Sequence, residues 1–224
     1  MHVRAQKWSF TMSIFELFCA LLYVGFFVSA MNKATWTQLL THPTLQHSVM
    51  ATSTIIAGLW AVKAGIYPQL DVHLLAMTAV TLVFGWRFAV LISTFALLLL
   101  VLFDVVPIWQ VALYGLTTAI LPIVITYGVF LLCYHFLPRH VFVYIFIGSF
   151  LTAALTAVAH ILTNSLLFYA LDQYDWPTIF DNYTVLAALI WFPEATINGM
   201  VITLLIIYRP HWVKTFYDKD YLAQ

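Results

Sequence analysis

The chain has 224 residues, of which 63% are hydrophobic and 8% are charged, and its mean hydropathy is +0.95. These values exclude a soluble globular protein and predict a polytopic membrane protein, whose surroundings are the lipid bilayer. The 9 Lys and Arg side chains balance the 9 Asp and Glu side chains, so the charge gives no indication of nucleic-acid binding.

Apolar runs long enough to cross a bilayer predict an all-α bundle of about seven transmembrane helices. The expected spans lie near residues 11–31, 49–67, 72–84, 88–103, 108–134, 141–170 and 183–208. The polar stretches Thr35–His47 and Asp172–Asn182 are expected to be loops, and residues 209–224 a polar tail. The whole chain, residues 1–224, is therefore expected to form one membrane domain.

An odd number of spans places the two termini on opposite sides of the membrane, and basic residues decide which side is cytoplasmic. One side would carry Lys33, Arg87, Arg139, Arg209, Lys214 and Lys219, and the other would carry Arg4, Lys7 and Lys63. This distribution predicts an outward N-terminus and a cytoplasmic tail.

His73 stands at the beginning of the short third span, two residues after Asp71. Ionisable groups inside membrane spans are costly and often functional. A neutral imidazole suits cobalt, nickel, copper or zinc, so His73 is a candidate metal ligand. The alternative is a histidine at a helix end that is hydrogen-bonded to Asp71 or to water.

Four further polar residues are expected within spans. Glu194 and Asn198 are four residues apart and share a helix face, so they could bind a cation or hold helices together, and we favour the second role. For His160, which has Thr163 and Asn164 beside it, we expect an interhelical hydrogen bond. Glu16 is expected to pair with Lys63 or with a polar residue of another helix.

No motif in the chain indicates catalysis or nucleotide hydrolysis. The two cysteines, Cys19 and Cys133, both lie in apolar runs and are expected to be buried free thiols. Walker A and catalytic spacings are absent, so we expect no enzyme, and any ATPase that drives transport would be a separate chain.

Several motifs together resemble the membrane subunits of the CbiM/NikM type, which bind the substrate of cobalt and nickel energy-coupling-factor transporters. The first is His73-Leu74-Leu75, followed by the small-residue helix and by Phe84-Gly85-Trp86. The later motifs are Leu137-Pro138-Arg139, Phe142–Phe146, Phe192-Pro193-Glu194-Ala195, Asn198-Gly199, Tyr208-Arg209-Pro210, Trp212-Val213, Thr215-Phe216 and Tyr221-Leu222. The similarity covers most of residues 65–222 and is greatest to a branch of bacterial inner-membrane permeases whose substrate is not assigned.

This resemblance implies a seven-helix, outward-open fold whose substrate is Co²⁺ or Ni²⁺, with no permanently bound cofactor. It also implies a separate ATPase and a coupling membrane subunit as partners. The implied metal ligands are the amine of Met1, the amide and imidazole of His2, and the imidazole of His73. The chain departs from the pattern at Val3–Trp8, which replaces an acidic Gly-Phe segment, and at Ala76, where the family has glycine.

Two functions therefore remain open from the sequence. The first is the capture of a transition-metal cation by a transport component. The second is a non-transporting accessory or assembly protein that has the same scaffold but no metal site.

Overall fold

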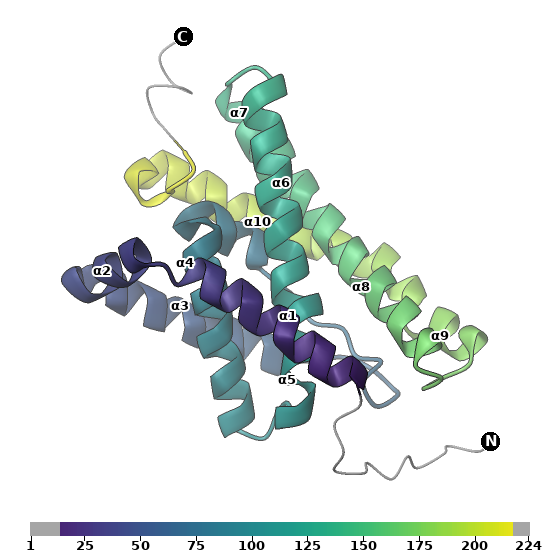
Figure 1. The fold of residues 1–224 in the computed structure, drawn as a ribbon. Helices are drawn as coiled ribbons and strands as arrows, with labels where there is room; N and C mark the ends of the chain where they lie inside the picture. Colours follow the sequence, from purple (N-terminus) through teal and green to yellow (C-terminus); the bar gives the residue numbers. More distant parts are fainter. Residues whose placement is uncertain (1–13, 217–224) are drawn as a thin grey trace.

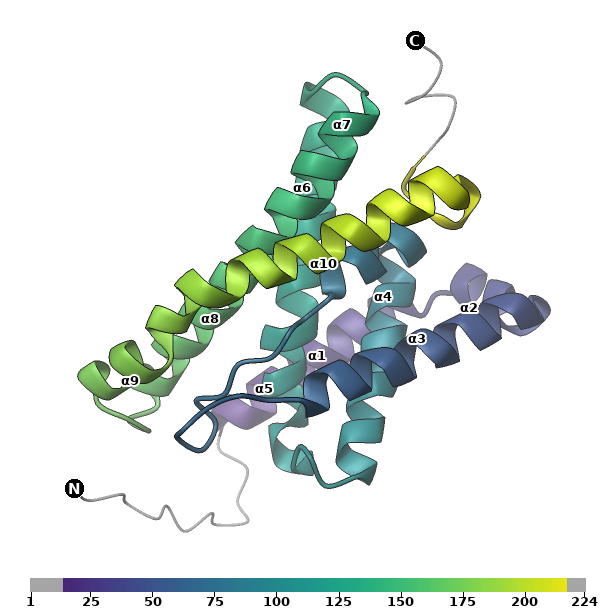
Figure 2. The ribbon, with the colours of Figure 1, turned by 180° about the vertical axis from the view of Figure 1, so that it is seen from behind.

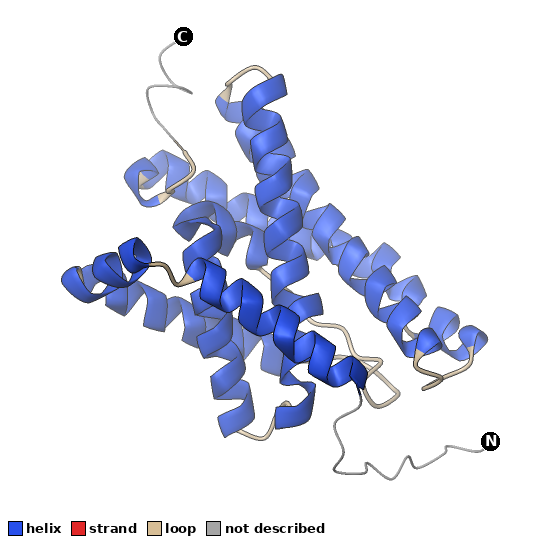
Figure 3. Cartoon of the chain, viewed as in Figure 1, coloured by secondary structure: helices blue, strands red, loops and turns tan. Residues whose placement is uncertain are grey.

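The computed structural model describes residues 14–216, and within them the regular secondary structure is helical (Figures 1 and 3). The one exception in this range is an isolated antiparallel bridge between Ala64 and Val72, in the non-helical segment 62–76. Met1 and His2, two of the expected metal ligands, lie outside the described residues.

Ten α-helices, three short 3-10 helices and two π-helical stretches follow one another in the described part of the chain. The α-helices are α1 (Ile14–Ala30), α2 (Lys33–Thr41), α3 (Pro43–Ala61), α4 (Met77–Leu102), α5 (Val111–Gly115), α6 (Leu121–Phe136), α7 (Val141–Val143), α8 (Thr152–Ala170), α9 (Trp176–Asn182) and α10 (Ala187–Tyr208). The 3-10 helices are η1 (Ile108–Gln110), η4 (Thr184–Leu186) and η5 (Pro210–Trp212), and the π-helices are η2 (Leu116–Ile120) and η3 (Tyr144–Leu151).

Four helical segments of the described chain are long and apolar enough to cross a membrane, and a bent pair brings the number to five at most. The four are Met77–Leu102, Ile108–Phe136, Val141–Ala170 and Trp176–Tyr208, and the bent pair is α1 with α2, which meet at 64°. The described chain therefore has fewer span candidates than the about seven spans expected. The prediction treated every long apolar run as a straight crossing, whereas several runs here bend or end early.

The second expected span is wrong in its position. Helix α3 runs from Pro43 to Ala61 and is not among the span candidates, while residues 62–67 are not helical. The preceding stretch, Thr35–His47, was expected to be a loop. It instead forms most of α2 and the start of α3. Asn32 caps α2 by accepting a hydrogen bond from the backbone N–H of Thr35, and Pro43 suits the first turn of α3.

The third and fourth expected spans form one interrupted helix, α4. The third does not begin at residue 72, since residues 72–76 are not helical and the helix begins at Met77. Gly85 breaks α4 with φ 77° and ψ 159°, which only glycine adopts readily. The break leaves carbonyls of the first half of α4 without helical partners, and the backbone N–H groups of Lys214 and Thr215 donate to Val83 and Leu82.

The remaining spans agree better with the expected boundaries. The apolar segments Ile108–Phe136 and Val141–Ala170 lie close to the predicted ranges 108–134 and 141–170. The last segment begins at Trp176, earlier than expected, because α9 forms within the stretch predicted to be a loop.

Long helices pack around α4, which contacts α3 on one side and α6 on the other. Helices α8 and α10 also pack together and lie side by side in both ribbon views (Figures 1 and 2). The non-helical segment 62–76, drawn as a thin trace between α3 and α4 in Figure 2, runs into the bundle before α4 begins. Its last residues therefore lie among the helices, and this arrangement positions the candidate site.

Candidate metal-binding cavity

A cavity of about 660 Å³ opens where the segment 62–76 meets α5, η2 and α8. His73, Tyr114, His160, Asn164 and Tyr183 are among the polar residues that line it. Four separate elements of the chain contribute these side chains, so only the folded bundle brings them together.

His73 is buried, with 8% of its surface exposed, and its ring points to polar partners. The hydroxyl of Tyr114 lies 2.8 Å from Nε2, and the carbonyl oxygen of Leu74 lies 3.3 Å from Nδ1. A carbonyl can only accept, so the consistent arrangement has Nδ1–H donating to Leu74 and Nε2 accepting from Tyr114. His73 thus lines the cavity, and its Nε2 lone pair is held by a single hydroxyl.

The environment of His73 keeps its imidazole neutral. His73 lies in the non-helical segment before α4, outside the spanning helices, and burial lowers the pKa of His73 below its ordinary value. The neighbouring His160 and Lys63 lower it further. A neutral imidazole is the form that binds a metal ion.

His160 is the second imidazole of the cavity, and its ring centroid lies 5.8 Å from that of His73. Nδ1 of His160 is 2.9 Å from the carbonyl oxygen of Thr117 and therefore carries a proton that it donates to η2. Nε2 lies 3.2 Å from Nδ2 of Asn164, which also donates to the hydroxyl of Tyr183. His160 thus joins α8 to η2, while its Nε2 accepts a bond from a neutral amide.

Glu194 and Asn198 lie on α10 next to the cavity segment, but they contact backbone groups and do not line the cavity. The carboxylate of Glu194 accepts from the N–H groups of Leu75 (2.8 Å) and Ala76 (2.7 Å). The side-chain oxygen of Asn198 accepts from the N–H of Ala79 at 2.7 Å, and its Nδ2 donates to Glu194. Helix α4 has no capping side chain of its own, so α10 supplies the cap.

The mouth of the cavity carries charged residues. Lys63 and Asp71 form an ion pair with an N–O distance of 3.5 Å, and Glu16 of α1 also lines the cavity. The sequence left open a hydrogen bond between His73 and Asp71. In the structure the side chain of Asp71 pairs with Lys63, and the ring of His73 contacts Tyr114 and Leu74. Gln173 lines the same cavity with its buried side-chain oxygen unpaired.

Sequence reasoning did not identify Tyr114 or Tyr183 as parts of this site, or Trp60 as a neighbour of His73. Trp60 donates from Nε1 to the carbonyl of Leu75, and its ring lies 6.2 Å from that of His73. An aromatic residue in an apolar run gives no signal of its own, because core packing explains it equally well. Only Asn164 was noticed, as a neighbour of His160.

Between residues 14 and 216 no group of three or more His, Cys, Asp or Glu side chains could hold a metal ion. Both cysteines in this range are free, Cys19 being buried and Cys133 half-buried. The donors that the described cavity does offer are the two imidazoles, together with neutral hydroxyl and amide groups. Around His73 and His160 this set is rich in nitrogen, while the carboxylates of the cavity, Glu16 and Asp71, lie on its charged part with Lys63.

The fold and the cavity define a multi-pass membrane protein with a buried polar site near one end of its helix bundle. Residues 8–212 match the family CbiM, described as the cobalt uptake substrate-specific transmembrane region. The match covers far more than half of the chain, so the protein belongs to this family. The protein is thus a membrane component of cobalt or metal uptake. The family consists of transport components and is not a family of enzymes. Comparison with curated proteins and with solved structures gave no match.

Proposed function

We propose that this protein captures Co²⁺ or Ni²⁺ in the cavity of His73 and passes it to an energising module. The observation that carries the proposal is that a member of a cobalt-uptake family holds two neutral imidazoles in one cavity. Imidazole nitrogen suits both ions, whereas calcium and magnesium prefer clusters of oxygen ligands, and residues 14–216 hold no group of three or more carboxylates that could bind a metal.

His73 is the proposed principal ligand, through Nε2. Binding there replaces one hydrogen bond from Tyr114, at a cost of roughly 1 kcal/mol. His160 is available as a second nitrogen donor or as a positioning residue. The amine of Met1 and the amide and imidazole of His2 complete the proposed site from outside the described residues.

Charge at the two ends of the bundle supports an orientation with the cavity facing outwards. The segments 62–76, 103–107 and 171–182, at the cavity end, carry Asp71, Asp104, Asp172, Asp175 and Asp181 with one basic residue, Lys63. The opposite end carries Lys33, Arg87, Arg139, Arg209 and Lys214 and, among described residues, no carboxylate. Basic residues favour the cytoplasmic side, so we place the protein in the bacterial inner membrane with its N-terminus outside. Acids at the entrance attract cations.

The proposed partners are a separate ATPase and a coupling membrane subunit. The described chain carries no nucleotide-binding loop, so the free energy for uphill transport has to come from another chain.

The decisive experiment measures Ni²⁺ and Co²⁺ binding to purified, tag-free protein by calorimetry and elemental analysis. His73→Ala is expected to weaken binding on the order of 10-fold or more, because a ligand is lost. His211→Ala is the matched control, since His211 is exposed in η5, just after α10, and lies outside the cavity. Equal affinity in wild type and His73→Ala would reject the metal site.

A second experiment tests the proposed contribution of Met1 and His2. A short extension before Met1 removes the free amine at that position and is expected to abolish binding, whereas the same extension after Gln224 is expected to leave it intact. Full binding by the N-terminally extended protein would remove Met1 from the ligand set while leaving His73 to be judged by its own variant.

A further inference from the structure

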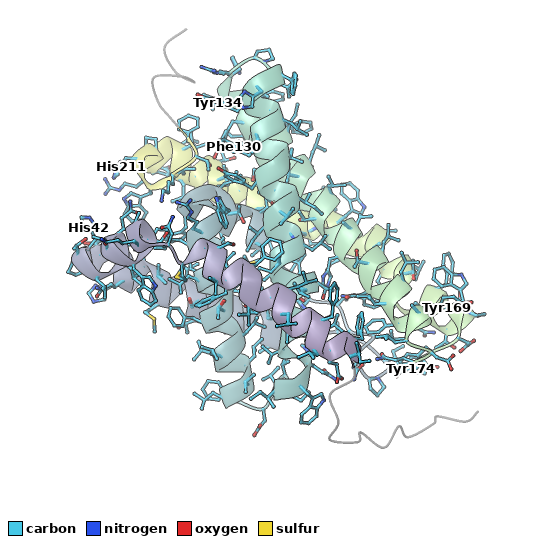
Figure 4. All side chains as sticks on the ribbon, in the orientation of Figure 1. His42, Phe130, Tyr134, Tyr169, Tyr174 and His211 are labelled. Atoms are coloured by element: carbon cyan, nitrogen blue, oxygen red, sulfur yellow. The ribbon has the colours of Figure 1, made fainter. Side chains whose placement is uncertain are left out.

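A second cavity, of about 590 Å³, lies at the end of the bundle opposite to His73. The break of α4 at Gly85, the last turns of α6 and the segment 213–216 form its walls. Figure 4 labels two of its lining residues, Phe130 and Tyr134, on α6 toward the same end as His211. Tyr169 and Tyr174 lie at the other end, and His42 lies at the turn between α2 and α3.

Basic side chains dominate the polar lining of this cavity. Arg87 follows the break of α4, Lys214 lies against the same break beside Gly85 and Phe88, and His135 is in the last turn of α6. Within residues 14–216 neither Arg87 nor Lys214 has a carboxylate oxygen within 4.0 Å. Burial, and then the charge of Arg87, lower the pKa of Lys214. The site therefore presents positive charge without a described counter-charge.

Aromatic rings hold the two cations in place. The guanidinium of Arg87 lies 5.2 Å from the ring centroid of Trp86, and Nζ of Lys214 lies 5.0 Å from that of Phe88. Such contacts restrict the side chains while leaving their N–H donors free to bind an anion. The backbone of Lys214 is fixed as well, because its N–H donates to Val83.

One wall of the cavity continues onto the apolar outer face of α6. Leu131 lines the cavity and is 39% exposed, and its neighbour Leu132 is 58% exposed on a helix apolar enough to span the membrane. The ligand chemistry that matches cations beside an apolar, membrane-facing surface is a phosphate attached to acyl chains. Basic pockets between transmembrane helices bind such headgroups.

We propose that this cavity binds the phosphodiester headgroup of an anionic phospholipid. The phosphate accepts hydrogen bonds from Arg87 and Lys214, and an acyl chain runs along Leu131. The lipid neutralises the two cations and ties the break of α4 to the segment 213–216. The proposal does not depend on the metal site, which lies at the other end of the bundle.

The test measures lipid retention by native mass spectrometry and thermal unfolding of the full chain in phosphatidylcholine nanodiscs, with and without phosphatidylglycerol. Wild type is expected to retain phosphatidylglycerol and to unfold at a higher temperature in its presence. The double variant Arg87→Gln/Lys214→Gln is expected to bind it roughly tenfold more weakly or worse, since two basic contacts are lost. Lys33→Gln/Arg209→Gln is the matched control, because it removes two cations outside the cavity.

Equal retention of phosphatidylglycerol by wild type and by the Arg87/Lys214 double variant would overturn the proposal. Inorganic phosphate, added to wild type in phosphatidylcholine alone, is expected to leave the unfolding temperature unchanged. A shift as large as that produced by phosphatidylglycerol would assign the cavity to a free anion and overturn the lipid assignment.

Discussion

His73 and Glu194 are two buried ionisable residues next to the start of α4, and their surroundings differ. His73 belongs to the non-helical segment before this helix, and Glu194 binds backbone groups of the same segment. Glu194 is 1% exposed, and its two carboxylate oxygens are occupied by the N–H groups of Leu75 and Ala76. His73 lines a cavity, and its Nε2 is held by one exchangeable hydroxyl. Both residues are costly to bury, but only His73 can exchange its partner for a ligand.

The difference shows that burial of an ionisable group in a membrane bundle does not by itself indicate a binding site. Glu194 and Asn198 replace the missing cap of α4, so their polar atoms satisfy the backbone. In each cavity histidine Nε2 instead accepts from one neutral side chain, Tyr114 or Asn164, a partner that a ligand can replace. The backbone that Glu194 caps begins at Leu75, two residues after His73, so the structural role and the proposed binding role meet in one short segment.

The largest effect is expected from Glu194→Ala. This substitution leaves two buried N–H groups without acceptors and is expected to lower the free energy of unfolding by about 2–4 kcal/mol. Reversible unfolding in mixed detergent micelles measures it. Glu194→Gln, which keeps the shape and one acceptor, is expected to lose less.

His73→Ala provides the contrast in the same assay. It removes a hydrogen bond to a hydroxyl that can turn to the cavity, so we expect a loss of about 1 kcal/mol. A loss as large as that of Glu194→Ala would give His73 a mainly structural role and remove the distinction between the two residues.

Tyr114→Phe sharpens the account of His73. The phenyl ring keeps the edge-to-face contact with Trp60 but removes the hydroxyl from Nε2, so stability is expected to fall by about 1 kcal/mol. Affinity for Ni²⁺ or Co²⁺ is expected to be equal or higher, since the competing hydrogen bond is gone. Weaker metal binding in this variant would instead make the hydroxyl of Tyr114 a ligand.

The smallest effect is expected from Ala76→Gly. Ala76 follows His73 by three residues, and its backbone N–H donates to Glu194. Ala76 has φ 55° and lies in the left-handed region, where glycine is the unstrained residue. Replacement by glycine is expected to stabilise the protein by about 0.5–1 kcal/mol in the same unfolding assay. Ala79→Gly, inside the helical part of α4, is the control and is expected to destabilise it. A loss of stability with Ala76→Gly would show that the strain at this residue is not released.

The sequence by itself determined the membrane class, the all-helical architecture and the family. These follow from hydropathy, which is a sum over neighbouring residues, and from motifs such as Phe84-Gly85-Trp86 that are local in the chain. It also placed the end of the third apolar run beside the break at Gly85. Capping signals at Asn32 and Pro43 were present but were overlooked in a stretch that looked polar.

Only the tertiary structure decided how many apolar runs are span candidates and which polar residues share a site. Hydropathy does not distinguish a straight crossing from a helix that bends by 64° or from a buried non-helical segment such as 72–76. His73 and Tyr114 are 41 residues apart, and Glu194 is 119 residues from Leu75, so their contacts depend on the packing of whole helices. These contacts form where α10 caps α4 and where η2 and α8 line the cavity. No local pattern of residues predicts them.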